Sequence, residues 1–219
     1  MTSEIDNTNG HDYVEIGGIK WATMNLGARN ITDIGLYFQW GDILGYTSEE
    51  VGEEKNFTWE DYKFNPSGDG TTFSKYNSTD LKTSLDTVDD AAASVWGSDW
   101  RVPSTSELQT LSNVVNVSWT NDYEDSGVPG LILTDKEDSS KVLFLPVTGV
   151  CSDGSIIDDD TTGFYWSKSL GNTDDKGLGL GFDKTNGTTW EYSNSRSLGF
   201  AIRPVLEGPA KRAIIGVTQ

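Results

Sequence analysis

The sequence predicts a single α+β domain in which two helices pack on a short-stranded antiparallel sheet with many loops. Three observations predict this class: one well-defined helix start, a run of short apolar segments after residue 130, and a high glycine content. The chain has 24 Gly among its 219 residues and only 35 % hydrophobic residues, which is typical of a protein with many turns. A chain of this length buries enough surface to form one complete core without disulfide bonds.

The N-terminal part contains a predicted hairpin. Residues 1–11 are polar, and we expect them to form a flexible tail ahead of a domain that spans residues 12–205. Residues 13–16 and 19–24 flank Gly17-Gly18, a pair that favours a two-residue turn between strands. Residues 36–40 (LYFQW) are predicted to form a buried strand, and the irregular but aromatic-rich residues 41–83 are expected to pack on the core.

Two helices are predicted in the middle of the chain. The stronger signal is the capping box at residues 104–107 (STSE), which precedes apolar residues at helical spacing through Val115. A second helix is expected at Asp89–Val95, with Asp89 and Asp90 at its positive N-terminal end and Gly97 at its stop. The neighbouring tryptophans are interpreted as core residues rather than as a platform for stacking sugars: Trp96, Trp100 and Trp119.

The second half is predicted to be mainly β, with turn residues between short apolar segments. The expected strands are residues 131–134, 142–147, 164–167, 178–182, 189–192 and 200–205. A C-terminal extension, residues 206–219, contains the apolar run 213–217 (AIIGV). This run would dock on the domain, add an edge strand or mediate self-association.

The charge argues against several classes of partner. The net charge of −18 and the pI near 4.2 disfavour nucleic acid and anionic membranes, because binding to phosphates depends on Lys and Arg. No stretch approaches the ~18 apolar residues of a membrane-spanning helix, so no membrane insertion is expected. No secretion signal is seen, since residues 1–13 lack a basic region followed by an apolar run.

The chain has few of the residues that usually carry out catalysis, and we expect that the protein is not an enzyme. The one histidine, His11, lies in the expected tail, so a Ser-His-Asp or Cys-His arrangement within the fold is disfavoured. The one cysteine, Cys151, has no activating neighbour and is interpreted as a buried structural residue. Arg203, within an apolar strand, is expected to be a buried cation paired with a carboxylate.

Neither a cofactor nor a metal is expected. The sequence has no Walker loop, no dinucleotide-binding glycine motif and no Cys/His set for zinc. Calcium is the metal to consider, and acidic clusters occur at residues 121–125, 158–160 and 174–175. None has the regular ligand spacing of an EF-hand, and all three are interpreted as solvated turns.

Five strings of residues occur in the same order as in a known family. They are residues 13–22 (YVEIGGIKWA), 35–42 (GLYFQWGD), 100–104 (WRVPS), 163–167 (GFYWS) and 199–205 (GFAIRPV). Together they resemble the Fibrobacter succinogenes major paralogous domain, a C-type-lectin-like module. More narrowly, they are similar to the variable proteins of diversity-generating retroelements carried by gut Bacteroides and their phages.

The resemblance implies a C-type-lectin-like fold and a division of the segment 163–205 into a fixed frame and variable positions. In that family, error-prone reverse transcription at template adenines rewrites the 3′ part of the gene. The frame would be Tyr165, Trp166, Leu180, Phe182, Trp190, Tyr192, Gly199, Phe200, Arg203 and Val205. The variable, ligand-facing set would be Lys168, Asn172, Asp174, Asp175, Lys176, Asp183, Lys184, Asn186, Glu191, Ser193, Asn194, Ser195, Arg196 and Ser197.

Three functions stay open at this point. The first is a hypervariable binder of a protein or glycan receptor on a cell surface, displayed on a phage tail or a bacterial surface. Its small, polar displayed set, in which Gly177, Gly179 and Gly181 alternate, would suit a polar or cationic target. The second is a fixed carbohydrate-binding or adhesion module, and the third is a hydrolase that uses an unrecognised pair of carboxylates.

Overall fold

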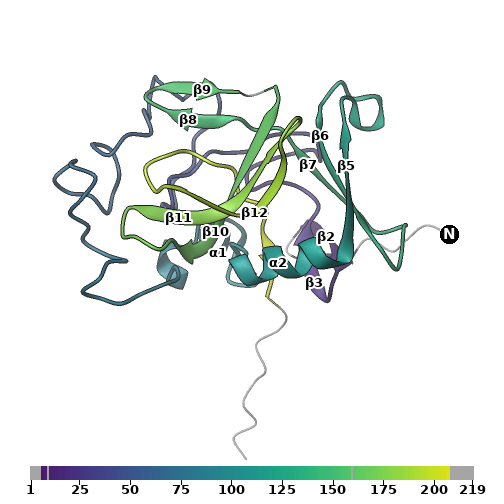
Figure 1. Ribbon diagram of the computed structural model, residues 1–219, viewed down its shortest axis with the longest axis horizontal. Helices are drawn as coiled ribbons and strands as arrows, with labels where there is room; N and C mark the ends of the chain where they lie inside the picture. Colours follow the sequence, from purple (N-terminus) through teal and green to yellow (C-terminus); the bar gives the residue numbers. More distant parts are fainter. Residues whose placement is uncertain (1–5, 9, 159, 208–219) are drawn as a thin grey trace, which may run out of the picture.

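The computed structural model describes residues 6–8, 10–158 and 160–207. These residues contain two α-helices and several small antiparallel sheets, which confirms the α+β class (Figure 1). The helices are α1 (Ala91–Trp96) and α2 (Thr105–Val114), with single 3-10 turns at Thr87–Asp89 and Tyr123–Asp125.

The strands form four antiparallel units. A sheet of order β1-β2-β3-β13-β4 contains Asp6–Thr8, His11–Ile16, Ile19–Ala22, Val205–Leu206 and Trp100–Arg101. The sheet β5-β6-β7 contains Val115–Thr120, Gly130–Asp135 and Val142–Pro146, and β8 (Val150–Ser152) pairs with β9 (Ser155–Ile157). The sheet β10-β11-β12, at the centre of Figure 1, contains Thr162–Leu170, Lys176–Asp183 and Gly187–Ser195.

The predicted N-terminal hairpin is confirmed, but the paired strands begin earlier than expected. Gly17 and Gly18 have φ values of 62° and 74°, the left-handed conformation that a tight hairpin turn requires. Strand β2 starts at His11, and β1 pairs with it inside the segment that was expected to be a tail. Residues 1–5 and 9 lie outside the described residues.

Both predicted helices are present, with one change at each. The Ser104 hydroxyl accepts from Glu107 N at 3.3 Å and Glu107 Oε2 accepts from Ser104 N at 2.8 Å, which confirms the capping box of α2. Val115 is not part of this helix and opens β5. Asp90 caps α1, whereas the Asp89 side chain faces Lys63 and Lys75 instead of the helix.

The segment 36–40 is buried from Tyr37 onward but does not form a regular strand. Tyr37 pairs with Tyr46 and Phe38 pairs with Phe200 through isolated bridges. Residues 41–83, the blue loops in Figure 1, contain no helix or strand, and all of them are described. Their aromatic rings still enter the core, which confirms that this segment packs on the domain: Phe57, Tyr62, Phe64, Phe73 and Tyr76 are all buried.

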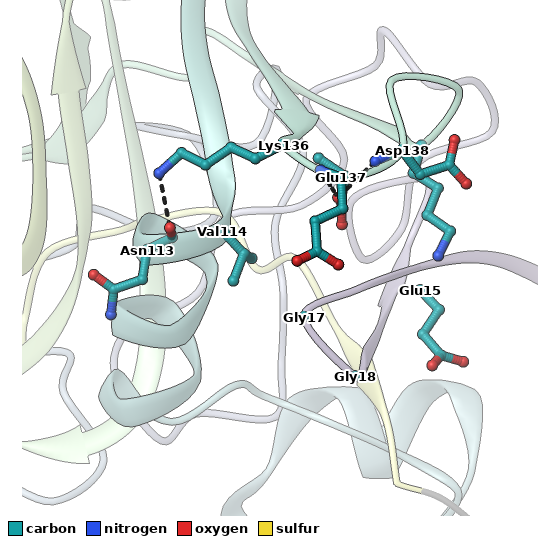
Figure 2. A pocket seen from close by; sticks show the side chains of 10 residues that line it. Glu15, Gly17, Gly18, Asn113, Val114, Lys136, Glu137 and Asp138 are labelled. Atoms are coloured by element: carbon teal, nitrogen blue, oxygen red, sulfur yellow. Dashed lines mark hydrogen bonds between the residues drawn. The ribbon is translucent and has the colours of Figure 1, made fainter.

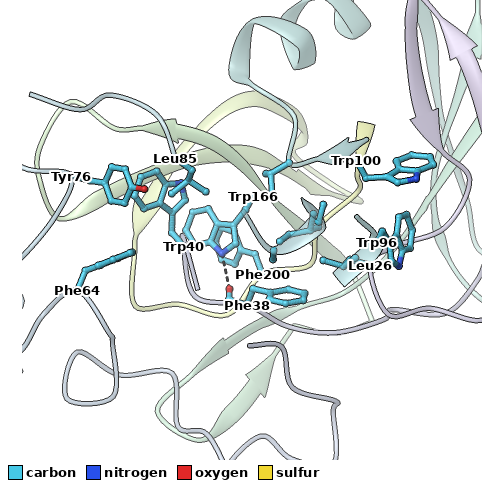
Figure 3. Packing of buried hydrophobic residues seen from close by; sticks show 14 of the residues in the cluster. Leu26, Phe38, Trp40, Phe64, Tyr76, Leu85, Trp96, Trp100, Trp166 and Phe200 are labelled. Atoms are coloured by element: carbon cyan, nitrogen blue, oxygen red, sulfur yellow. Dashed lines mark hydrogen bonds between the residues drawn. The ribbon is translucent and has the colours of Figure 1, made fainter. Parts of the chain in front are cut away.

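Aromatic packing holds the domain together beneath the central sheet. Trp166 stacks on Phe200 with ring centroids 4.0 Å apart, and its indole Nε1 donates to Phe38 O at 2.7 Å (Figure 3). Trp96 and Trp100 are buried in the same cluster, as predicted. Trp119 packs at the edge of a second cluster under α2. Large aromatic rings thus supply a core from few apolar residues.

The last strand is shorter than predicted. Only Val205–Leu206 forms a strand (β13), between β3 and β4, while residues 200 and 201 make isolated bridges. The C-terminal extension therefore begins inside the sheet, and the Glu207 carboxylate accepts from Arg101 Nε at 2.7 Å. The apolar run 213–217 lies outside the described residues.

Candidate ligand-binding site

The middle strand β11 is buried on both faces. Leu180 and Phe182 join the apolar cluster under α2 on one face. On the other face, a Cβ atom added to Gly177 would lie 2.6 Å from the ring of Trp40. The prediction that Gly177, Gly179 and Gly181 belong to the displayed set is wrong, because all three are buried. A Cβ atom at any of them would meet a neighbouring ring or the backbone of the next strand.

The predicted frame of the segment 163–205 is buried. Eight of its ten residues are buried: Tyr165, Trp166, Leu180, Phe182, Gly199, Phe200, Arg203 and Val205. The other two, Trp190 and Tyr192, are half-buried. These residues hold the backbone of the segment in place on all three strands.

Arg196 corrects the predicted ligand-facing set, because its side chain is fully buried. Its guanidinium donates to Tyr62 Oη at 2.8 Å and to the backbone carbonyls of Lys75, Tyr76 and Asp174. Five rings surround it, with centroids 4.6–6.0 Å from Cζ: Trp40, Tyr62, Phe64, Phe73 and Tyr76. Cation–π attraction and these hydrogen bonds make Arg196 a structural cation.

Ser197 is also buried, and its carbonyl accepts from Gln39 Nε2 at 2.8 Å. Arg203 is buried as predicted, but no carboxylate of the described chain pairs with it. It donates to Asn25 Oδ1 at 2.9 Å and to the carbonyls of Ala22 and Thr23. Burial lowers the pKa of Arg203 to about 10.

The other twelve predicted residues are at least partly exposed but do not form one continuous patch. One group surrounds the turn between β10 and β11: Asn172, Asp174, Asp175, Lys176, Asn194 and Ser195. A second group lies at the turn between β11 and β12: Asp183, Lys184 and Asn186. The eight residues of β11 separate these turns, which places them about 25 Å apart at ~3.3 Å per residue.

The three remaining residues lie elsewhere on the sheet. Glu191 accepts from Gln109 Nε2 at 2.8 Å, so it faces α2. Ser193 is exposed on β12, opposite Leu178. Lys168 is half-buried in β10, where its charge acts on the buried Asp90.

A pocket of about 220 Å³ opens at the second turn group. The rings of Phe164 and Tyr192 lie 5.3 Å apart, and Gly181 lies against both rings. The pocket is lined by Thr162, Phe164, Gly181, Phe182, Asp183, Asn186, Gly187, Thr189 and Tyr192. We name it the hairpin pocket, because the turn between β11 and β12 forms its rim. The pocket brings Asp183 and Asn186, two predicted ligand-facing residues, next to the rings of Phe164 and Tyr192.

Sequence reasoning did not identify most of this pocket. Tyr192 was assigned to the frame, and Phe164, Thr162 and Thr189 were not singled out. Their positions depend on strand register. The pairing of β10 with β11 places Phe164 opposite Gly181, and the pairing of β11 with β12 shifts by one residue between Gly179 and Gly181. A glycine within a strand marks a close approach of other groups, but a sequence does not specify which groups approach.

A larger and more polar cleft of about 660 Å³ lies between the β2–β3 turn, the end of α2 and the β6–β7 turn (Figure 2). Lys136 Nζ donates to Asn113 O at 2.7 Å, next to the last turn of α2. Asp135 Oδ1 accepts from the backbone N–H groups of Glu137 and Asp138. These hydrogen bonds close the turn and the helix end, so we interpret the cleft as a junction between elements.

The candidate catalytic groups are engaged in packing. His11 lies in β2, not in a tail, and its ring stacks on Trp96 with centroids 3.8 Å apart. Burial lowers the pKa of His11 and raises that of the Cys151 thiol, which is fully buried. Within the described part of the chain, no group of three or more His, Cys, Asp or Glu is placed to hold a metal ion.

Comparison with family models, curated proteins and solved structures gives no match for this chain. In the part of the chain that the structure describes, no helix has both the length and the apolar character needed to cross a membrane.

Proposed function

We propose that the protein is a hypervariable ligand- or receptor-binding protein that displays diversified residues on a C-type-lectin-like scaffold. One observation supports this most directly: in the segment 163–205 eight of the ten frame residues are buried, whereas the polar residues of the predicted ligand-facing set, apart from Arg196 and Ser197, are at least partly exposed. Exposed side chains of this kind can be exchanged at little cost in stability, usually within ~0.5 kcal/mol each. A rigid frame with exchangeable positions suits binding to changing targets.

The proposed partner is a protein or glycan receptor on a cell surface, contacted from a phage tail or a bacterial surface. The net charge of −18 supports a partner other than nucleic acid or an anionic membrane. The displayed set is the predicted set without Arg196 and Ser197, because these two side chains are buried. Binding rather than catalysis is proposed, because His11 and Cys151 are both engaged in packing.

A swap of the displayed residues tests this function. All exposed predicted positions between 172 and 195 would be replaced together by other polar residues, with the frame unchanged. We expect the thermal midpoint to change by only a few degrees, while binding of the labelled protein to a panel of Bacteroides strains changes or disappears. Unfolding of the swapped protein, or unchanged binding to every strain, would contradict the proposal.

The DNA around the gene provides a second test. A second, imperfect copy of the segment encoding residues 165–203, mismatched only at template adenines and next to a reverse transcriptase gene, is the expected result. A locus with neither feature would favour the fixed adhesion or carbohydrate-binding module instead. A glycan screen with and without calcium would then be the decisive measurement.

A further inference from the structure

The residues in and around the hairpin pocket are mainly acidic or uncharged. Asp183 lines the pocket, and no Lys, Arg or His is among its described lining residues. Asp158 and Asp160 are exposed in the preceding loop, which is tied to the pocket because Asp158 O accepts from Thr162 N at 3.1 Å. Lys184, in the turn itself, is the cation nearest in sequence, and it does not line the pocket. The local charge favours a positively charged occupant.

The polar groups of the pocket are mainly acceptors. Asp183 Oδ1 accepts from Thr185 N, Asn186 N and Asn186 Nδ2 at 2.6, 2.8 and 3.0 Å. The Thr162 hydroxyl donates its proton to Asp158 O at 2.9 Å. All three of the hydrogen bonds to Asp183 go to Oδ1, so Oδ2 of this carboxylate stays available, and the hydroxyls of Thr189 and Tyr192 can donate or accept. An occupant that brings N–H donors and a positive charge matches the available carboxylate oxygen.

The aromatic rings complete the pocket. Phe164 also stacks on Phe200 with centroids 5.1 Å apart, so its ring is fixed by the core. Tyr192 is half-buried and lies against Gly181, where a Cβ atom would come within 3.0 Å of its ring. Ring faces attract ammonium and guanidinium groups, and a carboxylate beside the rings adds a charge-assisted hydrogen bond.

We propose that the hairpin pocket binds an organic cation, the ammonium or guanidinium head group of a Lys or Arg side chain on the receptor. This inference rests on the proposed binding function and names the chemistry of one contact. A volume of about 220 Å³ is below the ~300 Å³ at which pockets begin to hold drug-sized ligands, so it suits a single head group.

Titration of the ¹⁵N-labelled full chain with small amines tests the proposal. The probes are N-acetyl-lysine methylamide and N-acetyl-arginine methylamide, and the neutral control is N-acetyl-norleucine methylamide. We expect saturable amide shifts at Gly181, Asp183 and Tyr192, with a Kd on the order of millimolar for so few atoms. The norleucine probe should bind at least about tenfold more weakly, which corresponds to the loss of one charge-assisted contact.

Variants of the two key side chains make the test specific. Asp183→Asn keeps an Oδ1 acceptor for the turn and removes the charge, so it should bind both amines about tenfold more weakly. Tyr192→Ala should lose a similar factor, and Tyr192→Phe should recover it, because the ring face is restored. Glu137→Gln, an exposed change in the other cleft, is the matched control for removal of one acidic charge.

Several results would overturn the proposal. One is equal binding of the neutral and charged probes, and another is saturable binding of methyl hexopyranosides in place of the amines. Calcium added as a chloride is a further arm, and displacement of the amines by calcium at equal concentration would point to a metal site instead. If the amines fail to bind while the swap of displayed residues still changes binding to the bacterial strains, the proposed cation site is wrong and the proposed function is still supported.

Discussion

Arg196 is a buried cation that joins three distant parts of the chain. It extends from the end of β12 into a cage of rings from the segment 40–76, and one of its acceptors is the Asp174 carbonyl in the β10–β11 turn. No carboxylate of the described chain forms an ion pair with it. A buried guanidinium is costly to desolvate, so its stability depends on this set of hydrogen bonds and rings.

Arg196→Lys should destabilise the protein by about 2–4 kcal/mol, because an ammonium cannot reproduce the planar set of donors. The midpoint of urea unfolding measures this. Arg29→Lys is the matched control, since Arg29 is exposed and its replacement should change stability by at most ~0.5 kcal/mol. Equal effects of the two substitutions would show that the cage contributes nothing specific.

At the scale of elements, the glycines of β11 differ in what surrounds them. A Cβ atom at Gly179 would lie 2.2 Å from the carbonyl oxygen of Tyr165, which belongs to the neighbouring strand. A Cβ atom at Gly181 would lie 3.0 Å from the half-buried Tyr192 ring, which can shift. Gly179→Ala should therefore cost about 3 kcal/mol and Gly181→Ala about 1 kcal/mol in unfolding free energy. The reverse order in urea unfolding would contradict this register.

The N-terminal cap of α2 makes the stability of the protein depend on pH. Burial of Glu107 opposes ionisation, but hydrogen bonds from Arg101, at 2.6 and 2.7 Å, and from Ser104 hold its pKa below the usual value. Folding thus favours the ionised form of Glu107. The contribution of this carboxylate to the free energy of unfolding is present above the unfolded pKa of ~4.3 and is lost as pH falls through the lower folded pKa.

Glu107→Gln should therefore destabilise the protein at pH 7, and the difference from the wild type should shrink as the pH falls below about 4. The carbonyl oxygen of glutamine can still accept from Ser104 N, but its NH2 group replaces the oxygen that accepts from Arg101 Nη2, so the charge and one acceptor are removed together. Urea unfolding of both proteins across this pH range measures the difference. A difference that stays constant would show that the Arg101–Glu107 pair does not depend on ionisation.

The elements that the sequence predicts well are those defined by local signals. The capping box at Ser104, the hairpin turn at Gly17-Gly18 and the stop of α1 at Gly97 all follow from neighbouring residues. Burial of Arg196 and the hairpin pocket do not, because both depend on contacts between residues far apart in sequence. A polar residue between turn residues is usually exposed, and Arg196 is buried because rings and hydrogen-bond acceptors from a distant segment surround it.

At the scale of the whole molecule, a long irregular segment supplies much of the core. Residues 41–83 lack helices and strands, yet Phe57 and Tyr76 are fully or almost fully buried. A network of charges ties the segment to the turn before α1, where Asp89 accepts from Lys63 Nζ at 3.1 Å and from Tyr76 Oη at 2.6 Å. Hydrogen bonds from Lys75, Tyr76 and Lys63 outweigh the effect of burial and lower the pKa of Asp89.

This arrangement predicts the pattern of proteolysis. Chymotrypsin should cut the native protein slowly within residues 57–76, because cleavage of a buried site requires local opening. Arg196→Ala removes the centre of the cage, so cleavage after Tyr62, Phe73 and Tyr76 should become faster by about tenfold or more, detected by mass spectrometry of the fragments. Arg29→Ala should leave the rate unchanged. Faster cleavage at sites spread over the whole chain would mean global unfolding, whereas selective cleavage at 57–76 would identify this segment as a unit that Arg196 holds against the β10-β11-β12 sheet.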